Sequence, residues 1–359
     1  MTNIKYIGMD VHMESISVCV RNSVSKIVME CVIETKASTI LQFLDGLRGG
    51  LRVVFEEGTW ATWLYDLLKP HVTEVLVCNT RKNAVRDGSK SDRIDARKLS
   101  EQLYLNNVKS VYHGDCGLRM MKELARSYLT ITQDLTRVMN RLKALYRSWG
   151  IPCAGDEVYA SRYRAEWLAN ISEAGVRRRA EHYYQQLDVL RPLRQEVRRD
   201  LLLESRKHKI WKLLRLIPAI GPIRAAILIA VMQTPHRFRT KRQLWTYSGL
   251  ALETYDSGEY RAVKGQLERT KKQATVRGLN KEYNHDLKDI FKGAAMRAST
   301  AAGPLHDFYQ ALLAKGRKPT LARLTLARKI AAITLIVWKK EVRFDANYLK
   351  PQAALSASG

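Results

Sequence analysis

Short β-prone runs alternate with helical segments over the first 78 residues, and this order restricts the fold more than any other feature of the sequence. Three runs follow one another with only polar breaks between them, which predicts an antiparallel meander. Two further runs each come after a segment with helical spacing. The predicted strands are residues 4–11, 15–20, 27–33, 52–56 and 74–78, and the predicted helices are residues 38–47 and 63–69. Such an order indicates a mixed sheet with helices on both faces.

Residues 91–97, with the sequence Ser-Asp-Arg-Ile-Asp-Ala-Arg, have the features of a first helical turn. Ser91 is a preferred N-cap residue, and Asp92 and Asp95 are three positions apart. Both carboxylates therefore project from one face at the positive end of the predicted helix, an arrangement that suits a metal ion. Acidic residues in a first turn often only complement the helix dipole, so this stretch alone leaves both interpretations open.

Two further acidic residues end predicted strands. Asp10 closes the first strand and Glu56 closes the fourth. Because sites in open α/β sheets gather at strand ends, these carboxylates and the pair on the helix are predicted to converge. Glu56 is favoured over the adjacent Glu57 because it shares a strand face with Val54, but the sequence does not decide between them. Taken individually, Asp10 also fits a turn residue and Glu56 a solvated strand end.

Four converging carboxylates repel one another unless cations neutralise them, and this is the arrangement that a pair of Mg²⁺ ions requires. Two such ions activate an attacking oxygen and stabilise a leaving oxygen. The five cysteines include no Cys-x-x-Cys pair, which argues against a zinc site or a disulfide framework. The sequence therefore predicts phosphoryl transfer with Mg²⁺ as the cofactor.

The charge balance indicates the partner. The chain has 61 Lys and Arg against 35 Asp and Glu, which gives a formal net charge of +26 and a sequence pI near 10.0. This excess points to a polyanion, and nucleic acid is the leading candidate. A membrane is the weaker candidate because the longest apolar runs, such as residues 330–338, are too short to span a bilayer. No signal-peptide pattern opens the chain, so an intracellular, cytoplasmic protein is expected.

From about residue 118 the spacing of apolar residues becomes helical over long stretches. One stretch covers residues 118–149 and another covers about 160–209, with Gly175 as a candidate break and a Gly-Ile-Pro sequence between the two stretches. Two long helices around such a break predict an antiparallel, coiled-coil arm that spaces domains or pairs subunits, so a dimer or tetramer is expected. The basic clusters on these helices fit a solvated face and phosphate contact equally well.

Residues 216–226 place Gly221 between two prolines. A tight turn at this glycine would expose backbone amides to a phosphate, as in helix-hairpin-helix modules, although a plain αα-hairpin is the alternative. A helical C-terminal part follows. Its basic residues are candidates for nucleic-acid contact: Arg239, Lys241, Arg242, Arg261, Lys264, Arg269, Lys271, Lys272 and Arg277.

In their order along the chain, these segments resemble the DEDD insertion-sequence transposases, a family that includes the bridge-RNA-guided recombinases. The segments that carry the resemblance are Gly8-Met9-Asp10, the strand ending at Glu56, residues 91–97 and 217–221, and Tyr247-Ser248-Gly249-Leu250 followed by Asp256-Ser257-Gly258. The resemblance implies a RuvC-like (RNase H-like) α/β domain at residues 1–113, a helical arm at 114–208, a mainly α transposase domain at 209–345 and a tail at 346–359.

The resemblance also implies the chemistry. The metal-binding tetrad would be Asp10, Glu56, Asp92 and Asp95. Ser257 would attack a DNA phosphodiester and leave a covalent phosphoserine link, whereas without the resemblance Ser257 is an ordinary turn serine. Family members are similar in working as oligomers whose sites combine one subunit's tetrad with another's serine. A structured noncoding RNA that pairs with donor and target DNA, and a place in the prokaryotic cytosol or nucleoid, are further implications.

One departure from the family pattern bears on the site. The family usually has Glu-Ala-Thr-Gly where this chain has Glu56-Glu57-Gly58-Thr59, which leaves the catalytic glutamate ambiguous by one residue.

The sequence and the resemblance together leave three hypotheses for the function. The leading one is an RNA-guided transposase or recombinase that uses Ser257. The second is a RuvC-like structure-specific nuclease in which water attacks, and the third is a non-catalytic nucleic-acid-binding protein whose carboxylates only cap helices.

Overall fold

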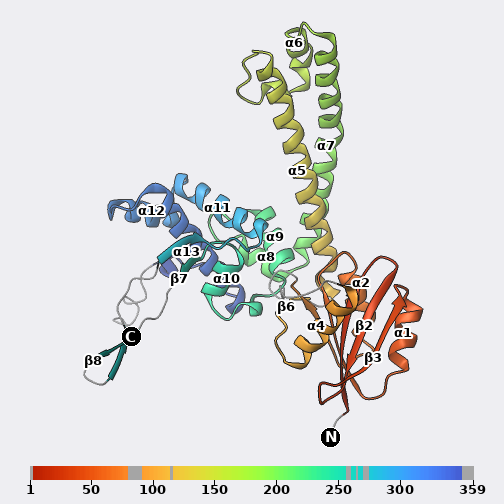
Figure 1. The fold of residues 1–359 in the computed structure, drawn as a ribbon. Helices are drawn as coiled ribbons and strands as arrows, with labels where there is room; N and C mark the ends of the chain where they lie inside the picture. The colour runs from red at the N-terminus through yellow and green to blue at the C-terminus, as the bar shows by residue number, and fades with distance from the viewer. Residues whose placement is uncertain are drawn as a thin grey trace. The chain divides into compact units, whose positions relative to one another are not determined.

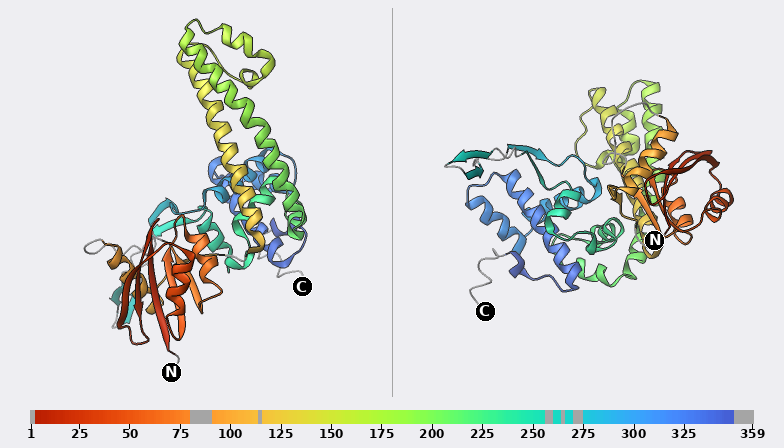
Figure 2. Two further views of the ribbon diagram at one scale, coloured as in Figure 1. Left: turned by 90° about the vertical axis from the view of Figure 1, so that its right-hand side faces the viewer. Right: turned by 60° about the horizontal axis from the view of Figure 1, so that its bottom comes forward.

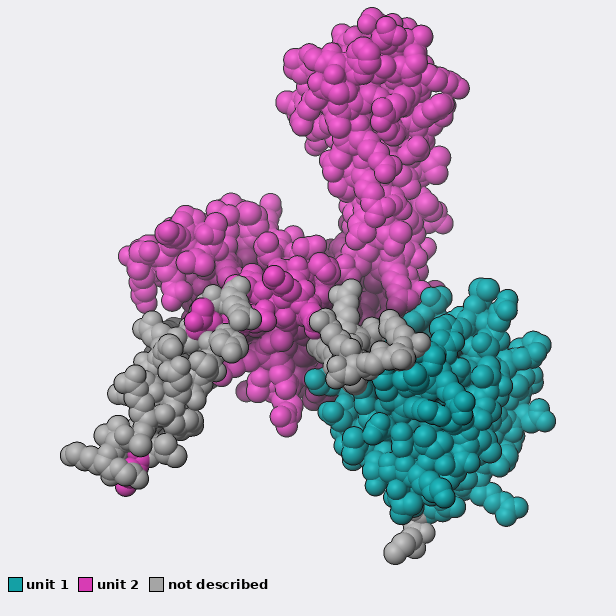
Figure 3. Space-filling model, viewed as in Figure 1, with its two compact units in different colours: residues 1–114 teal, residues 115–359 magenta. Residues whose placement is uncertain are grey.

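The computed structural model describes residues 3–79, 91–113, 116–255, 260–263, 266–269 and 275–349. The chain divides into two compact units, residues 1–114 and residues 115–359 (Figure 3). The finer division of the second unit into an arm, a C-terminal domain and a tail stays a prediction.

A six-stranded mixed sheet forms the centre of the first unit (Figure 1). Its strands, in spatial order, are β3 (Ile27–Glu34), β2 (Ser15–Arg21), β1 (Ile4–Val11), β4 (Gly50–Glu56), β5 (Glu74–Cys78) and β6 (Ser110–Val111). The first three pair antiparallel as the predicted meander, whereas β1 with β4 and β4 with β5 are parallel. The two-residue β6, which the sequence does not predict, pairs antiparallel with β5. The predicted mixed sheet is confirmed.

Helices cover both faces of this sheet. α1 (Ala37–Asp45) and α2 (Ala61–Leu68) pack on one face, where their apolar residues share a buried cluster with residues of β1 and β4. α4 (Asp92–Tyr104) packs on the other face. The alternation of side chains along β4 explains the division, because Phe55 joins the cluster of α1 and α2, whereas Val54 joins a second cluster with the leucines of α4.

Two long helices of the second unit, α5 (Arg119–Ser148) and α7 (Ala174–Arg206), run side by side, as Figures 1 and 2 both show. Their apolar faces enclose a buried cluster in which the hydroxyl oxygens of Tyr146 and Tyr184 lie 3.1 Å apart. The short α6 (Arg164–Ala169) lies between them in the sequence. The predicted break at Gly175 is wrong, because Gly175 lies in the first turn of α7 and the helical stretch is interrupted between α6 and α7 instead. Coiled-coil packing of the two long helices stays a prediction.

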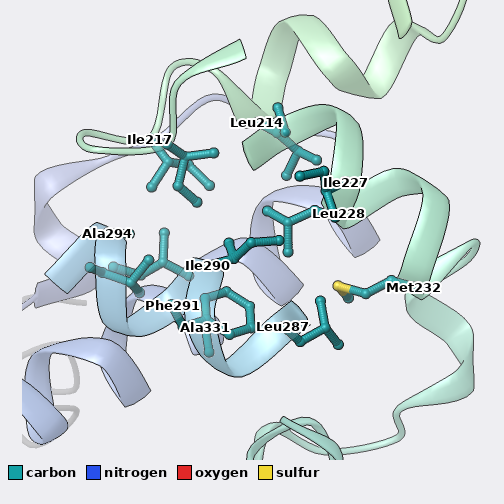
Figure 4. Close-up of a cluster of buried hydrophobic side chains, with 14 of the residues drawn as sticks. Leu214, Ile217, Ile227, Leu228, Met232, Leu287, Ile290, Phe291, Ala294 and Ala331 are labelled. Carbon is teal, nitrogen blue, oxygen red and sulfur yellow. The ribbon is translucent and has the colours of Figure 1, made fainter. Parts of the chain in front are cut away.

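The other helices of the second unit form a larger core (Figure 4). They are α8 (Lys209–Leu214), α9 (Pro222–Met232), α10 (Lys241–Tyr247), α11 (His285–Thr300), α12 (Pro304–Ala314) and α13 (Pro319–Lys340). Leu228 of α9, Phe291 of α11 and Ala331 of α13 are fully buried in this core. None of the helices in the described part of the chain is both long and apolar enough to cross a bilayer.

Two short antiparallel ladders interrupt this helical part, where the sequence predicts no strands. β7 (Leu252–Tyr255) pairs with β10 (Thr275–Leu279), and β8 (Tyr260–Val263) pairs with β9 (Gln266–Arg269). The connection between α8 and α9 passes through Ala219, which has a φ of 68°. The helix-hairpin-helix assignment of this connection stays a prediction.

Candidate metal centre

Gly8 lets α4 lie directly on β1. A Cβ atom on this glycine would overlap the carbonyl oxygen of Ala96 and the amide nitrogen of Ser100, both in α4. Backbones approach this closely only where no side chain separates them. Because side chains alternate along a strand, Asp10 points to the same side of the sheet as position 8, which is the side that α4 covers. The Asp10 side chain is 18% exposed.

The first turn of α4 presents two carboxylates near this strand end. Ser91 is the N-cap, as predicted, because its Oγ accepts a hydrogen bond from the amide of Ile94 at 3.3 Å. Asp92 and Asp95 follow in the first turn, and their side chains are 62% and 40% exposed. Acidic side chains at this position interact favourably with the positive end of the helix dipole.

His12 lies between the strand and the helix, and the sequence analysis does not single it out. Its Nε2 is 3.2 Å from Oδ2 of Asp10 and 3.5 Å from Oδ2 of Asp92. Ligand atoms of these three residues all lie within 4.8 Å of one another. The signal in the sequence is the spacing, because His12 follows Asp10 by two positions and therefore points to the same side of the extended chain.

The electrostatics of Asp10 reflect this crowding. Burial raises the pKa of Asp10 above its usual value, and the charges of Asp92 and Asp95 raise it further, although the hydrogen bond and charge of His12 act in the opposite direction. The folded protein therefore disfavours the ionised carboxylate of Asp10, and a bound cation would remove that penalty.

Glu56 lies at the end of β4, the parallel neighbour of β1. The two strands are in register, with Met9 opposite Phe55, so Asp10 and Glu56 are the next residues on each strand. Glu56 points to the same side as Val54, which packs on α4. Glu57 is the next residue after β4, and its backbone amide donates a hydrogen bond to the carbonyl of Cys78 on β5 at 2.9 Å. The alternation favours Glu56 as the glutamate of the site.

The charges of Glu56 and Glu57 also affect the thiol of Cys78 on the neighbouring strand β5. Burial, followed by the charges of Glu56 and Glu57, raises the pKa of Cys78 to about 12. This cysteine is therefore a neutral thiol at physiological pH.

The donor set fits a hard divalent cation. Carboxylate oxygens are the preferred ligands of Mg²⁺, and an imidazole nitrogen is also accepted by Mn²⁺ and related ions. Ligand atoms separated by less than 4.8 Å need only small rotations to bind one ion. The structure thus brings Asp10 and Asp92 together, with Asp95 nearby and Glu56 on the same face of the sheet; that these side chains bind Mg²⁺ stays a prediction.

The remaining predicted residues belong to the second unit. Gly221 is the N-cap of α9. Lys241 and Arg242 begin α10, which Thr240 caps, and Arg239 precedes this cap. The backbone of Arg261 and Arg269 lies in the ladder of β8 and β9, and that of Arg277 lies in β10. The proposed nucleophile Ser257 lies outside the described residues, as do Lys264, Lys271 and Lys272.

A six-stranded mixed sheet, helices on both faces and acidic side chains at the end of its central strand are together consistent with a RuvC-like domain. Comparison with known families agrees with this class. Residues 7–149 match a transposase model of the DEDD type of IS110 elements, and residues 211–310 match the model of the transposase IS116/IS110/IS902 family. The chain belongs to this family of insertion-sequence transposases and is therefore a DNA-processing enzyme. No curated protein matches the chain.

Proposed function

We propose that the protein cleaves and exchanges DNA strands in a reaction that depends on divalent metal ions, with Mg²⁺ at a two-metal site. The observation that carries this proposal is the meeting of Asp10, His12 and Asp92, whose ligand atoms lie within 4.8 Å although they come from β1, the residues after it and α4. Structural charges are ordinarily paired with opposite charges, whereas like charges gathered at a strand end are typical of a functional site.

The carboxylates have distinct parts in this proposal. Asp10, Glu56, Asp92 and Asp95 hold the ions, and His12 adds a nitrogen donor. When bound, divalent ions supply positive charge that stabilises the phosphoryl-transfer transition state and lowers the pKa of the attacking hydroxyl group. The close packing of α4 on Gly8 keeps the ligands of the helix and the strand at a constant separation.

Ser257 is the proposed nucleophile. Its Oγ forms a bond to the phosphorus of a DNA phosphodiester, the bond between phosphorus and the displaced strand end breaks, and the hydroxyl proton passes to water. Attack by the end of another strand then releases the serine, so strands are exchanged rather than hydrolysed. Family membership and the Asp256-Ser257-Gly258 sequence support this role.

Donor and target DNA are the proposed partners, with a structured noncoding RNA as guide and a homo-oligomer, a dimer or tetramer, as the working form in the prokaryotic cytosol or nucleoid. The net charge of +26 supports polyanion binding. The proposed backbone contacts are Gly221, Arg239, Lys241, Arg242, Arg261, Lys264, Arg269, Lys271, Lys272 and Arg277.

The proposal is tested by purifying the protein from cells that carry its native flanking DNA and sequencing the co-purifying nucleic acid. The complex is then incubated with that DNA and Mg²⁺, with wild type, Ser257→Ala and Asp92→Asn side by side on a denaturing gel. We expect a protein–DNA covalent band in the wild type alone and one enriched RNA. Nicking by both wild type and Ser257→Ala without a covalent band would show a nuclease instead, and binding without strand breakage would show a non-catalytic protein.

A further inference from the structure

Glu30 of β3 connects the sheet to the first two turns of α4. Nη2 and Nε of Arg93 lie 2.6 Å and 3.2 Å from Oε2 of Glu30, and Nη2 of Arg97 lies 2.7 Å from the same oxygen. Nε of Arg97 donates to the other carboxylate oxygen, Oε1. One carboxylate therefore binds two guanidinium groups of the same helix, and only 14% of the Glu30 side chain is exposed.

This connection persists across the physiological pH range. Hydrogen bonds from Arg97 and then Arg93 lower the pKa of Glu30 to about 2, so its carboxylate is ionised at neutral pH. Hydrogen bonds in which both partners are charged are roughly twice as strong as neutral ones, and guanidinium groups bind carboxylates with defined geometry. The contact of Glu30 with the two arginines therefore sets the orientation of α4 relative to β3 as well as attracting the helix to the strand.

These polar contacts supplement the packing of α4 on Gly8 in positioning the first turn of the helix. Among the described side chains of this helix, Ala96 is the first that is buried, and the other buried residues come later, at Leu99, Ser100 and Leu103. The apolar anchor of α4 thus lies after the turn that presents its carboxylates. The contacts of Arg93 and Arg97 with Glu30 hold that turn against β3, the edge strand of the sheet.

We propose that Glu30 is a positioning residue for the metal centre. By binding Arg93 and Arg97 it fixes the first turn of α4, so that the aspartates of this turn stay close to the end of β1 despite the repulsion among their charges. Arg93 directly follows one of these aspartates and Arg97 is two positions after the other. Metal ligands have to be held within about 0.5 Å of their working positions, so a small shift of this turn weakens binding. This inference rests on the proposed metal site.

A matched control lies in the same sheet. Glu74 of β5 accepts a hydrogen bond from Nε of Arg52 on β4. These residues are opposite each other where the two strands begin, whereas Glu56 and Cys78 are opposite each other where they end. Glu74→Gln therefore removes an ion pair of the same chemistry from the same sheet but from the end that lies away from the carboxylates.

The experiment is a titration of the full-length protein with Mn²⁺, followed by electron paramagnetic resonance, for wild type, Glu30→Gln and Glu74→Gln. We expect the dissociation constant of Mn²⁺ to rise about tenfold in Glu30→Gln, as for other residues that orient metal ligands, and to stay unchanged in Glu74→Gln. DNA cleavage by Glu30→Gln should recover when Mg²⁺ is raised. Wild-type Mn²⁺ affinity in Glu30→Gln, or an equal loss in both variants, would overturn the proposal.

A second variant covers the case in which Glu30→Gln does not fold. Glu30→Asp keeps the charge but shortens the side chain, so we expect a smaller rise of the Mn²⁺ dissociation constant in the same direction, and an unchanged value would overturn the positioning role. A wild-type protein that binds no Mn²⁺ would contradict the metal centre itself. If the wild type binds Mn²⁺ tightly, and Asp92→Asn abolishes this binding but Glu30→Gln leaves it intact, only the role of Glu30 would be contradicted.

Discussion

Where β4 and β5 begin, Arg52 and Glu74 form a direct ion pair, and the same arginine donates a hydrogen bond to Asn106 at 3.1 Å. Where β1 and β4 end, Asp10 meets another carboxylate, that of Asp92, with His12 between them. The first end neutralises its charges within the fold. The second brings carboxylates together with fewer opposite charges, although Nζ of Lys98 lies 3.7 Å from Oδ1 of Asp95. Burial, and then the charges of Asp92 and Asp95, raise the pKa of Asp10 there.

This difference shows how one sheet separates stability from function. Paired charges at one end contribute to folding, whereas like charges at the other end oppose folding and are typical of a functional site. The fold tolerates the second arrangement because Gly8 brings α4 onto the sheet and Glu30 holds the first turn of that helix. Variants that change one end and spare the other therefore test the comparison.

The largest expected effect follows from Asp10→Asn. Loss of a metal ligand removes several kcal/mol of transition-state stabilisation, so Mg²⁺-dependent DNA cleavage should fall by about 1000-fold or more. The melting temperature in a metal-free buffer should rise, because the raised pKa of Asp10 means that folding disfavours its ionised form. Glu74→Gln should show the reverse, with cleavage retained and melting temperature lowered. Cleavage by Asp10→Asn at the wild-type rate would refute the metal centre.

A smaller effect is expected from Gly8→Ala. The new methyl group would overlap the backbone of α4 at Ala96 and Ser100, so the helix has to move away from β1. Overpacking of this kind lowers the free energy of unfolding by about 1–3 kcal/mol. Urea denaturation measures the change. Gly58→Ala is the control, since a Cβ atom at position 58 has open space around it, and equal losses in the two variants would contradict the close packing.

His12→Ala tests whether the imidazole belongs to the centre. An imidazole ligand favours Mn²⁺ over Mg²⁺, so the variant should lose several-fold in Mn²⁺ affinity and less in Mg²⁺ affinity. Calorimetric titration with each ion separately measures the ratio. An equal loss for both ions would mean that His12 acts on the carboxylates rather than on the metal.

The smallest effect is the acid dependence of the contact between Glu30 and the α4 arginines. The pKa of Glu30 is lowered from 4.5 to about 2, so the contact stabilises the fold fully above pH 4.5 and is lost as the pH falls toward 2. Because the guanidinium groups are partly exposed, solvent screens the contact and its contribution to stability is small. The melting temperatures of wild type and Glu30→Gln should differ at pH 6 and converge near pH 2. A difference that is the same at both pH values would contradict an ionic contact.

Local patterns account for most of what the sequence predicts correctly in the first unit. Alternating residues predicted the meander of β1, β2 and β3, and serine before two aspartates predicted the N-cap of α4. The ladders of β7 to β10 and the two-residue β6 were missed, because so few residues carry no periodicity and their pairing depends on distant partners. Ser257 was inferred from resemblance alone, since a single serine in a polar stretch has no pattern of its own.

The sequence by itself determined the order of the strands along the chain and the acidic residues at strand and helix ends, because these depend on neighbouring residues. It also determined the net charge of +26, which favours a polyanionic partner and depends on composition alone. Only the tertiary structure decided which of them meet. The contact of His12 with Asp92 and the contacts of Glu30 with two arginines join residues that the chain separates widely. Gly8 leaves room for α4 to lie against β1, and that fit is a property of the folded chain.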